Sequence, residues 1–231
     1  MKRVPMALSA LALLVAPGGL GLAADAKPSY PAMAPIEQYR IASQRDEIAM
    51  ARSAAPASIS KDAEVMVLGE HGYETVVKGT NGFVCLVERS WSAPFGDPVF
   101  WNPKIRGPIC MNPAAVRTVL PAEVERTRWA LSGVSKADML ARSQKSATAN
   151  ALPAPGSIGY MMSPQGYLSD SDGHWHPHLM FYGPRTTAAA LGANLPGSPI
   201  FIGEEGPEPT SVFFVPVAKW SDGSSAEADK H

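Results

Sequence analysis

Apolar and polar positions follow a helical pattern early in the chain and an extended pattern after it. Across residues 36–55, apolar residues are interleaved with charged ones, which predicts a surface helix that Pro56 would stop. Across residues 64–88, β-branched and aromatic residues are separated by glycines, which predicts three strands. We expect a meander whose last two strands are joined by a tight turn through residues 79–82.

The middle of the chain carries two helix start signals. Asn112 precedes a proline, as an N-cap precedes the first helical position, and an apolar stripe continues from there to Leu131. Ser135 and Asp138 then resemble a capping box that opens a further helix, which fades by residue 150. The pattern therefore predicts two helical regions between the β-rich parts of the chain.

Strand-forming residues return in the last third of the chain, at residues 158–162, 173–182, 200–202 and 212–215. Strands, helices and strands in this order favour an α+β fold with a mostly antiparallel sheet and helices packed on one face. We expect a single globular domain over residues 27–221. The polar residues 222–231 are predicted to form a disordered tail.

Residues 1–26 have the features of a signal peptide. Lys2 and Arg3 precede an apolar run at residues 6–16, and residues 24–26 offer small side chains for cleavage. The apolar run is shorter than an ordinary membrane span, and no later segment reaches about 18 unbroken apolar residues. We expect a secreted or periplasmic protein without a transmembrane segment after cleavage.

Composition narrows the classes of partner. The chain has 231 residues with 45% hydrophobic content, which suffices for one sizeable core. Its formal net charge is −1 and its pI is about 6.5, so it has no basic field for nucleic acid or an anionic membrane surface. We expect no nucleic-acid partner.

Cys85 and Cys110 are the only cysteines, and in an oxidising compartment the simplest expectation is a disulfide between them. Such a bond would stabilise the fold by about 3 kcal/mol. The alternative is a free thiol that acts as a nucleophile with a histidine. With the disulfide formed, the proline-rich segment 91–108 between the cysteines is expected to be an ordered, cross-linked loop. Its aromatic residues Trp91, Phe95 and Trp101 would either bind a ligand or pack beneath the loop.

The sequence GHWHPHLMFY at residues 173–182 holds three of the five histidines. In an extended strand His174, His176 and His178 share one face, and neutral imidazoles on one face are typical of Zn(II), Cu(II) or Fe(II) sites. Adjacent members lie about 6.6 Å apart, so two can chelate one ion, and a third requires a bend at Pro177. Because proline cannot donate to a ladder, we expect Pro177 on an edge strand or at a bulge.

Carboxylates near this stretch are the expected additional ligands. Asp172 precedes the histidines, and Glu204 follows the next predicted strand. The sequence around Asp172 resembles a fragment of a calcium loop without its distal glutamate, so it predicts a turn. The alternative is that the histidines are surface residues with no ion.

Known catalytic motifs are incomplete in this chain. Residues 58–61 match the S-x-x-K pattern of serine penicillin-interacting enzymes, but the middle motif of that family is missing and the position is wrong for a helix start. The sequence therefore assigns no reaction.

Four phrases in the chain resemble those of a group of uncharacterised exported bacterial proteins. They are VKGTNGFVCLVER at residues 77–89, FWNPK at 100–104, GHWHPHLMF at 173–181 and VPVAKWSDG at 215–223. The resemblance covers most of the mature chain and implies a bacterial origin and no particular mechanism.

Two hypotheses follow from the sequence. The first is an exported metal-binding protein, with or without enzymatic activity, that uses the histidine cluster. The second is a non-catalytic envelope binding module that uses the aromatic loop 91–108 and has structural histidines.

Overall fold

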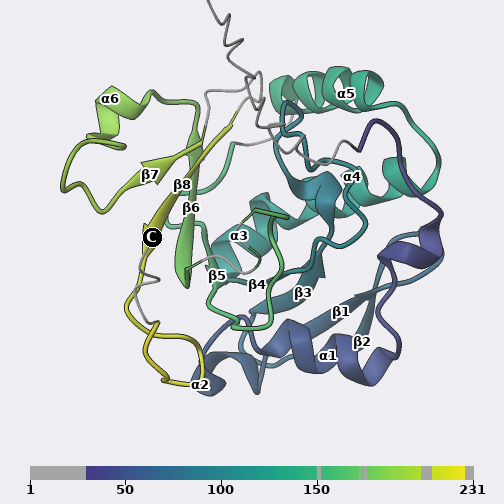
Figure 1. Ribbon diagram of the computed structural model, residues 1–231, viewed down its shortest axis with the longest axis horizontal. Helices are drawn as coiled ribbons and strands as arrows, with labels where there is room; N and C mark the ends of the chain where they lie inside the picture. The colour runs from purple at the N-terminus through teal and green to yellow at the C-terminus, as the bar shows by residue number, and fades with distance from the viewer. Residues whose placement is uncertain (1–29, 150–151, 172, 174–175, 204–209, 227–231) are drawn as a thin grey trace, which may run out of the picture.

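The computed structural model describes residues 30–149, 152–171, 173, 176–203 and 210–226 (Figure 1). The expected signal peptide, residues 1–26, lies outside this part of the chain, as do Asp172, His174 and Glu204.

The described strands form one eight-stranded, mostly antiparallel sheet with the order β2-β1-β3-β4-β5-β6-β8-β7. With the helices described below, it confirms the α+β class. The strands are β1 (Glu64–Leu68), β2 (Tyr73–Val77), β3 (Val84–Glu88), β4 (Gly107–Met111), β5 (Ile158–Met161), β6 (His178–Pro184), β7 (Phe201–Ile202) and β8 (Thr210–Pro216).

Two helices, α3 and α5, begin at the caps that the sequence predicts in the middle of the chain. The Asn112 side chain accepts a hydrogen bond from the Ala115 amide at 3.0 Å, and Ser135 accepts one from the Asp138 amide at 3.1 Å. The helices are η1 (Ile36–Tyr39), α1 (Gln44–Arg52), α2 (Ala57–Ser60), η2 (Ser90–Ser92), α3 (Pro113–Thr118), α4 (Leu120–Leu131), α5 (Lys136–Ala149) and α6 (Ala188–Leu191).

The single helix expected over residues 36–55 is instead two separate elements, η1 and α1. The Ser43 side chain caps α1 by accepting a hydrogen bond from the Asp46 amide at 3.1 Å. A serine cap inside the periodic segment therefore starts a new helix, which the apolar pattern alone does not reveal.

The helices pack against both faces of the sheet, whereas one covered face was expected. Cys85 and Val87 of β3 pack in a cluster with Ala51 of α1. Leu86, which points to the opposite face, packs in a second cluster with Ala130 of α4 and other residues of α3–α5. Strand β3 is therefore buried on both sides.

A buried ion pair ties α1 to the sheet. The Arg89 guanidinium lies 2.8 Å from the Glu47 carboxylate, with 0% and 6% of the two side chains exposed. Glu47 also accepts the Leu68 amide at 3.1 Å, and Arg89 donates to the Tyr39 carbonyl at 2.6 Å. These further hydrogen bonds offset the cost of removing both charges from water.

The expected meander over residues 64–88 is wrong in its last step. Strand β3 pairs with β1 in parallel, on the side of β1 away from β2. The connection from β2 crosses the start of β1, where Thr80 donates its amide to the Asp62 carbonyl at 2.8 Å. A Cβ atom on Gly79 would lie 2.1 Å from the Glu64 nitrogen, so only glycine allows this crossing.

The first part of the predicted disordered tail is ordered. Asp222 accepts the Ser224 amide at 2.9 Å, and the Ala226 amide donates to the Ala218 carbonyl at 3.0 Å. The polar composition of this segment therefore reflects a hydrogen-bonded turn through residue 226.

Candidate functional site

The histidine stretch enters the sheet at His178, the first residue of β6. Strand β6 lies between β5 and β8, so the expectation of an edge strand is wrong. Pro177 precedes the strand and needs no ladder donor there, while its carbonyl accepts the Val217 amide at 2.8 Å. Of the three histidines, His176 lies before the strand and His174 is outside the described residues.

His178 is a buried, neutral imidazole with a defined tautomer. Only 3% of the residue is exposed, and its Nδ1 lies 2.7 Å from the His176 carbonyl oxygen. Because a carbonyl only accepts, Nδ1 carries the proton and Nε2 carries the lone pair. Burial lowers the pKa of His178 below its usual value, so the ring is neutral at pH 7, the form that ligates metal ions.

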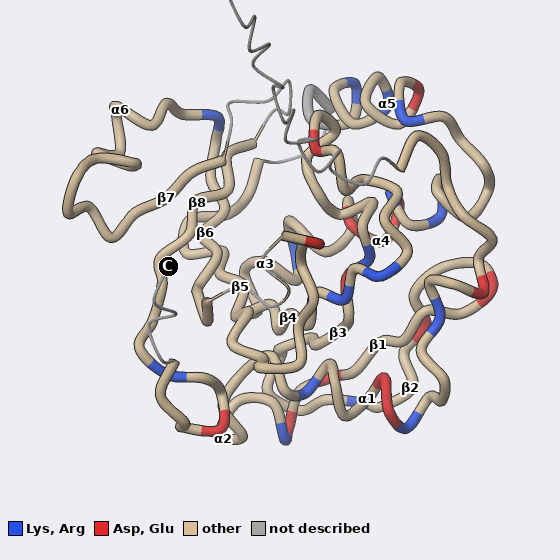
Figure 2. Tube along the Cα trace, in the orientation of Figure 1, with Lys and Arg blue, Asp and Glu red and all other residues tan. Residues whose placement is uncertain are grey.

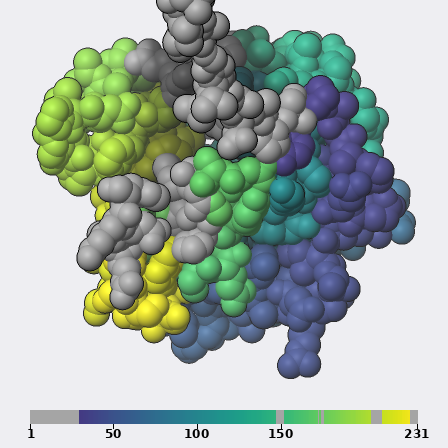
Figure 3. Space-filling model, in the orientation of Figure 1, coloured from purple at the N-terminus to yellow at the C-terminus, as the bar shows by residue number. Residues whose placement is uncertain are grey.

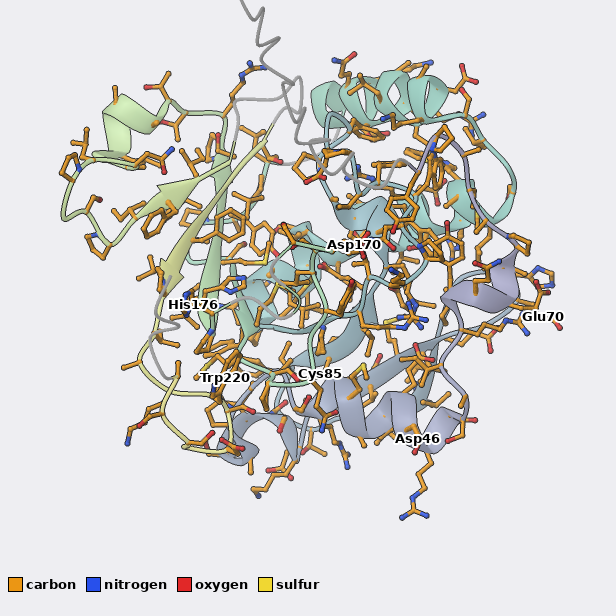
Figure 4. All side chains as sticks on the ribbon, in the orientation of Figure 1. Asp46, Glu70, Cys85, Asp170, His176 and Trp220 are labelled. Carbon is orange, nitrogen blue, oxygen red and sulfur yellow. A yellow bond between two sulfur atoms is a disulfide. The ribbon has the colours of Figure 1, made fainter. Side chains whose placement is uncertain are left out.

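His176 and His178 line the same pocket, whose volume is about 170 Å³. Its other walls are Phe201 of β7 with Phe214 and Pro216 of β8. Figure 2 shows no Lys, Arg, Asp or Glu along β6, β7 or β8. Figure 4 places His176 beside β6 and β8. The pocket therefore combines an uncharged apolar wall with two imidazoles.

A second, smaller cavity of about 10 Å³ lies beside His178 and is also lined by Ser163. Ser53 donates its hydroxyl to the Met50 carbonyl at 2.6 Å, so in its 2.6 Å contact with Ser163 it is the acceptor. The Ser163 hydroxyl thus donates its proton to Ser53. Ser163 Oγ in turn accepts a hydrogen bond from the Gln165 amide at 3.1 Å. This arrangement does not prepare Ser163 as a nucleophile for His178.

Asp170, the described acidic residue nearest in sequence to the histidines, is engaged elsewhere. It accepts hydrogen bonds from the Tyr30 and Tyr167 hydroxyls, and Lys104 lies 3.2 Å away. The hydrogen bond from Tyr167, followed by that from Tyr30, holds the pKa of Asp170 well below its usual range. In the part of the chain that the structure describes, no three His, Cys, Asp or Glu side chains are grouped to hold a metal ion.

The aromatic side chains of the 91–108 loop lie in the core. Trp91, Phe95 and Trp101 are 0%, 4% and 7% exposed, and the Trp91 indole donates to the Thr127 hydroxyl at 3.0 Å. These rings therefore pack under the loop and do not present a ligand-binding surface. The envelope-module hypothesis loses the residues on which it depended.

The expected disulfide between Cys85 and Cys110 is present, and it joins directly paired residues of β3 and β4. Both cysteines are fully buried. The alternative of a free nucleophilic thiol is therefore excluded.

Phe201, Phe214 and Pro216 are pocket residues that the sequence did not identify. Their strands were predicted, but they reach the histidines through the pairing of Phe201 with Phe214 and of His178 with Pro216. Strand order and register are set by tertiary packing, and no local pattern in these segments indicates them.

Within the described residues, no helix combines the length and apolar character needed to cross a membrane. No family model matches the sequence, and no curated protein or solved structure matches it at a significant level.

Proposed function

We propose that this chain is an exported protein that binds a transition-metal ion at the pocket between β6, β7 and β8, through the imidazoles of His176 and His178. The observation that carries the proposal is that two histidines line one pocket, one of them neutral and fixed in its tautomer by a backbone carbonyl. The leader-like residues 1–26 and the buried disulfide support export.

Imidazole nitrogen suits Zn(II), Cu(II) and Fe(II), and the uncharged apolar wall would shield the ion from bulk water. Two protein ligands leave coordination positions for further donors. Asp172, His174 and Glu204 are donors close in sequence to the pocket strands. With an open position, such an ion could activate water or exchange a small ligand.

Metal titration of the chelator-treated mature protein tests the proposal. Calorimetry with Zn(II) or Cu(II) should give one equivalent bound, and His176→Ala should weaken binding by about 100-fold or more because a direct ligand is lost. His176 is exposed and precedes its strand, so the variant should fold normally. His71→Ala removes an exposed histidine from a turn and serves as the matched control.

Retained affinity in both His176→Ala and His178→Ala would contradict the proposal, as would a wild-type protein that binds no metal. His178 is buried, so thermal unfolding of its variant must accompany the titration. The exposed His176 variant keeps the test decisive even if the His178 variant is unstable.

A further inference from the structure

The dimensions and lining of the pocket indicate what else it binds. Its volume is about 170 Å³, and a cavity of about 150 Å³ with apolar walls is large enough for one benzene ring. Phe201, Phe214 and Pro216 supply the apolar walls, and the two imidazoles supply the polar end. We propose that the pocket binds a small neutral aromatic molecule with a hydroxyl substituent, of the size of phenol.

The exposed wall of the pocket supports this inference. Phe201 is 45% exposed although it sits on a paired strand of the sheet. The segment that carries α6 and β7 forms a lobe at the side of the molecule (Figure 3). A ring seated against Phe201 would remove apolar surface of both partners from water, and this burial is the main driving force for binding an apolar ligand.

Ring packing in the pocket suits an aromatic ligand. The His178 and Phe214 rings meet edge to face, with centroids 5.6 Å apart and an interplanar angle of 70°. A ligand ring in the pocket can make the same kind of contact with Phe201 or Phe214, which contributes beyond its buried area. An aliphatic molecule of equal volume lacks this contribution, so cyclohexanol should bind more weakly than phenol.

The absence of charge on the pocket strands selects a neutral ligand. Strands β6, β7 and β8 carry no Lys, Arg, Asp or Glu. A carboxylate would lose its hydration with no cationic partner on these strands, whereas a phenolic hydroxyl can hydrogen-bond to an imidazole. Benzoate should therefore bind more weakly than phenol in the metal-free protein.

The inference rests on the proposed function only in using the same pocket, and the two can fail separately. With a metal ion at the imidazoles, the ligand oxygen would point towards the ion. Without metal, the apolar walls and an imidazole hydrogen bond remain.

Titration of the chelator-treated protein with phenol, followed by the NMR signals of the protein, tests the inference. We expect saturable binding with a Kd of about 1 mM, as for a ligand of this size. Phe201→Ala should weaken binding about fivefold by removing a wall without changing the imidazoles. Leu195→Ala is the matched control, because Leu195 is 58% exposed and lies outside the pocket lining.

Lack of saturable phenol binding, or equal affinity in wild type and Phe201→Ala, would overturn the inference. Phenol binding without metal binding would support the inference and refute the proposed function. Metal binding without phenol binding would do the reverse. Melting temperatures of both variants confirm that the comparison concerns folded protein.

Discussion

Asp170 and Glu88 are acidic side chains whose surroundings shift their pKa in opposite directions. Hydrogen bonds from Tyr167 and Tyr30 lower the pKa of Asp170. Burial raises the pKa of Glu88 well above its usual value, and the nearby charge of Glu123 adds to this shift. Ionisation therefore stabilises the fold at Asp170 and opposes it at Glu88.

Asp170→Asn should lower the free energy of unfolding at pH 7 by about 2 kcal/mol, because hydrogen bonds to a carboxylate are stronger than those to an amide. The folded pKa of Asp170 lies below the unfolded value of about 3.9. The stability difference between wild type and Asp170→Asn should therefore be full above the unfolded pKa and disappear as pH falls through the folded pKa. Urea unfolding between pH 7 and pH 2.5 measures this difference.

Asp62→Asn is the control for that series, because Asp62 is a surface carboxylate that forms an exposed ion pair with its neighbour Lys61. It should change stability by less than about 0.5 kcal/mol. A deficit in Asp170→Asn that did not shrink in acid would show that packing, and not charge, stabilises this position.

Glu88→Gln should have the opposite effect. Below about pH 4 the Glu88 carboxyl is protonated in both the folded and the unfolded protein, so no charge is buried on folding. Because its folded pKa is raised, the wild-type protein loses stability as pH rises through that pKa. Arg126 of α4 lowers the pKa of Glu88 and only partly offsets this loss. The variant should match wild type near pH 4 and exceed it at pH 8 by on the order of 1 kcal/mol.

Thermal unfolding as a function of pH checks the Glu88 prediction, with Glu70→Gln as a control at an exposed site. Glu123 of α4 must be considered in the same measurement, because its pKa is raised by burial and its charge acts on Glu88. Burial also raises the pKa of Tyr73 and Tyr182. Both phenols therefore stay neutral over this range. An unchanged stability profile would mean that Glu88 is solvated when charged.

At the scale of elements, the crossing over β1 depends on one glycine. Gly79→Ala would place a methyl group against the backbone of Ala63 and Glu64, with no flexible side chain to move aside. We expect a loss of about 3 kcal/mol in the free energy of unfolding. Gly96→Ala is the matched control, since a Cβ there meets no atom within 4 Å. Equal stability of the two variants in guanidinium unfolding would refute the crossing described for residues 78–83.

Local patterns predicted where most strands and helices lie, but not how they are arranged. The caps at Asn112 and Ser135 could be identified because a side chain and an amide three residues apart suffice to form them. The parallel pairing of β3 with β1 could not be predicted from the sequence, because a glycine-containing connection can form either a hairpin or a crossing. Pro177 suggested an edge strand, yet a proline just before a strand leaves every ladder position intact.

At the scale of the whole molecule, the pocket is formed by three strands in the last third of the chain, β6, β7 and β8, together with His176 just before β6. The histidine stretch at residues 174–178 could be recognised as unusual from spacing alone. Phe201 and Phe214 complete the pocket through long-range pairing that hydrophobic alternation does not specify. The same limitation explains the helices on both faces, since residues 84–87 of β3 are all apolar and are buried under α1 on one side and under α3–α5 on the other.

The disulfide joins Cys85 to the residue directly opposite it in the β3–β4 ladder. Slippage of that ladder by one residue would exchange the two faces of the strand, placing Leu86 where Val87 belongs. An oxidised chain keeps Cys85 beside Cys110 after unfolding, so its refolding starts with one correctly paired position already adjacent. A reduced chain must search for that alignment among competing registers. The covalent bond thus favours the native register of β3 and β4 during refolding, in addition to its effect on equilibrium stability.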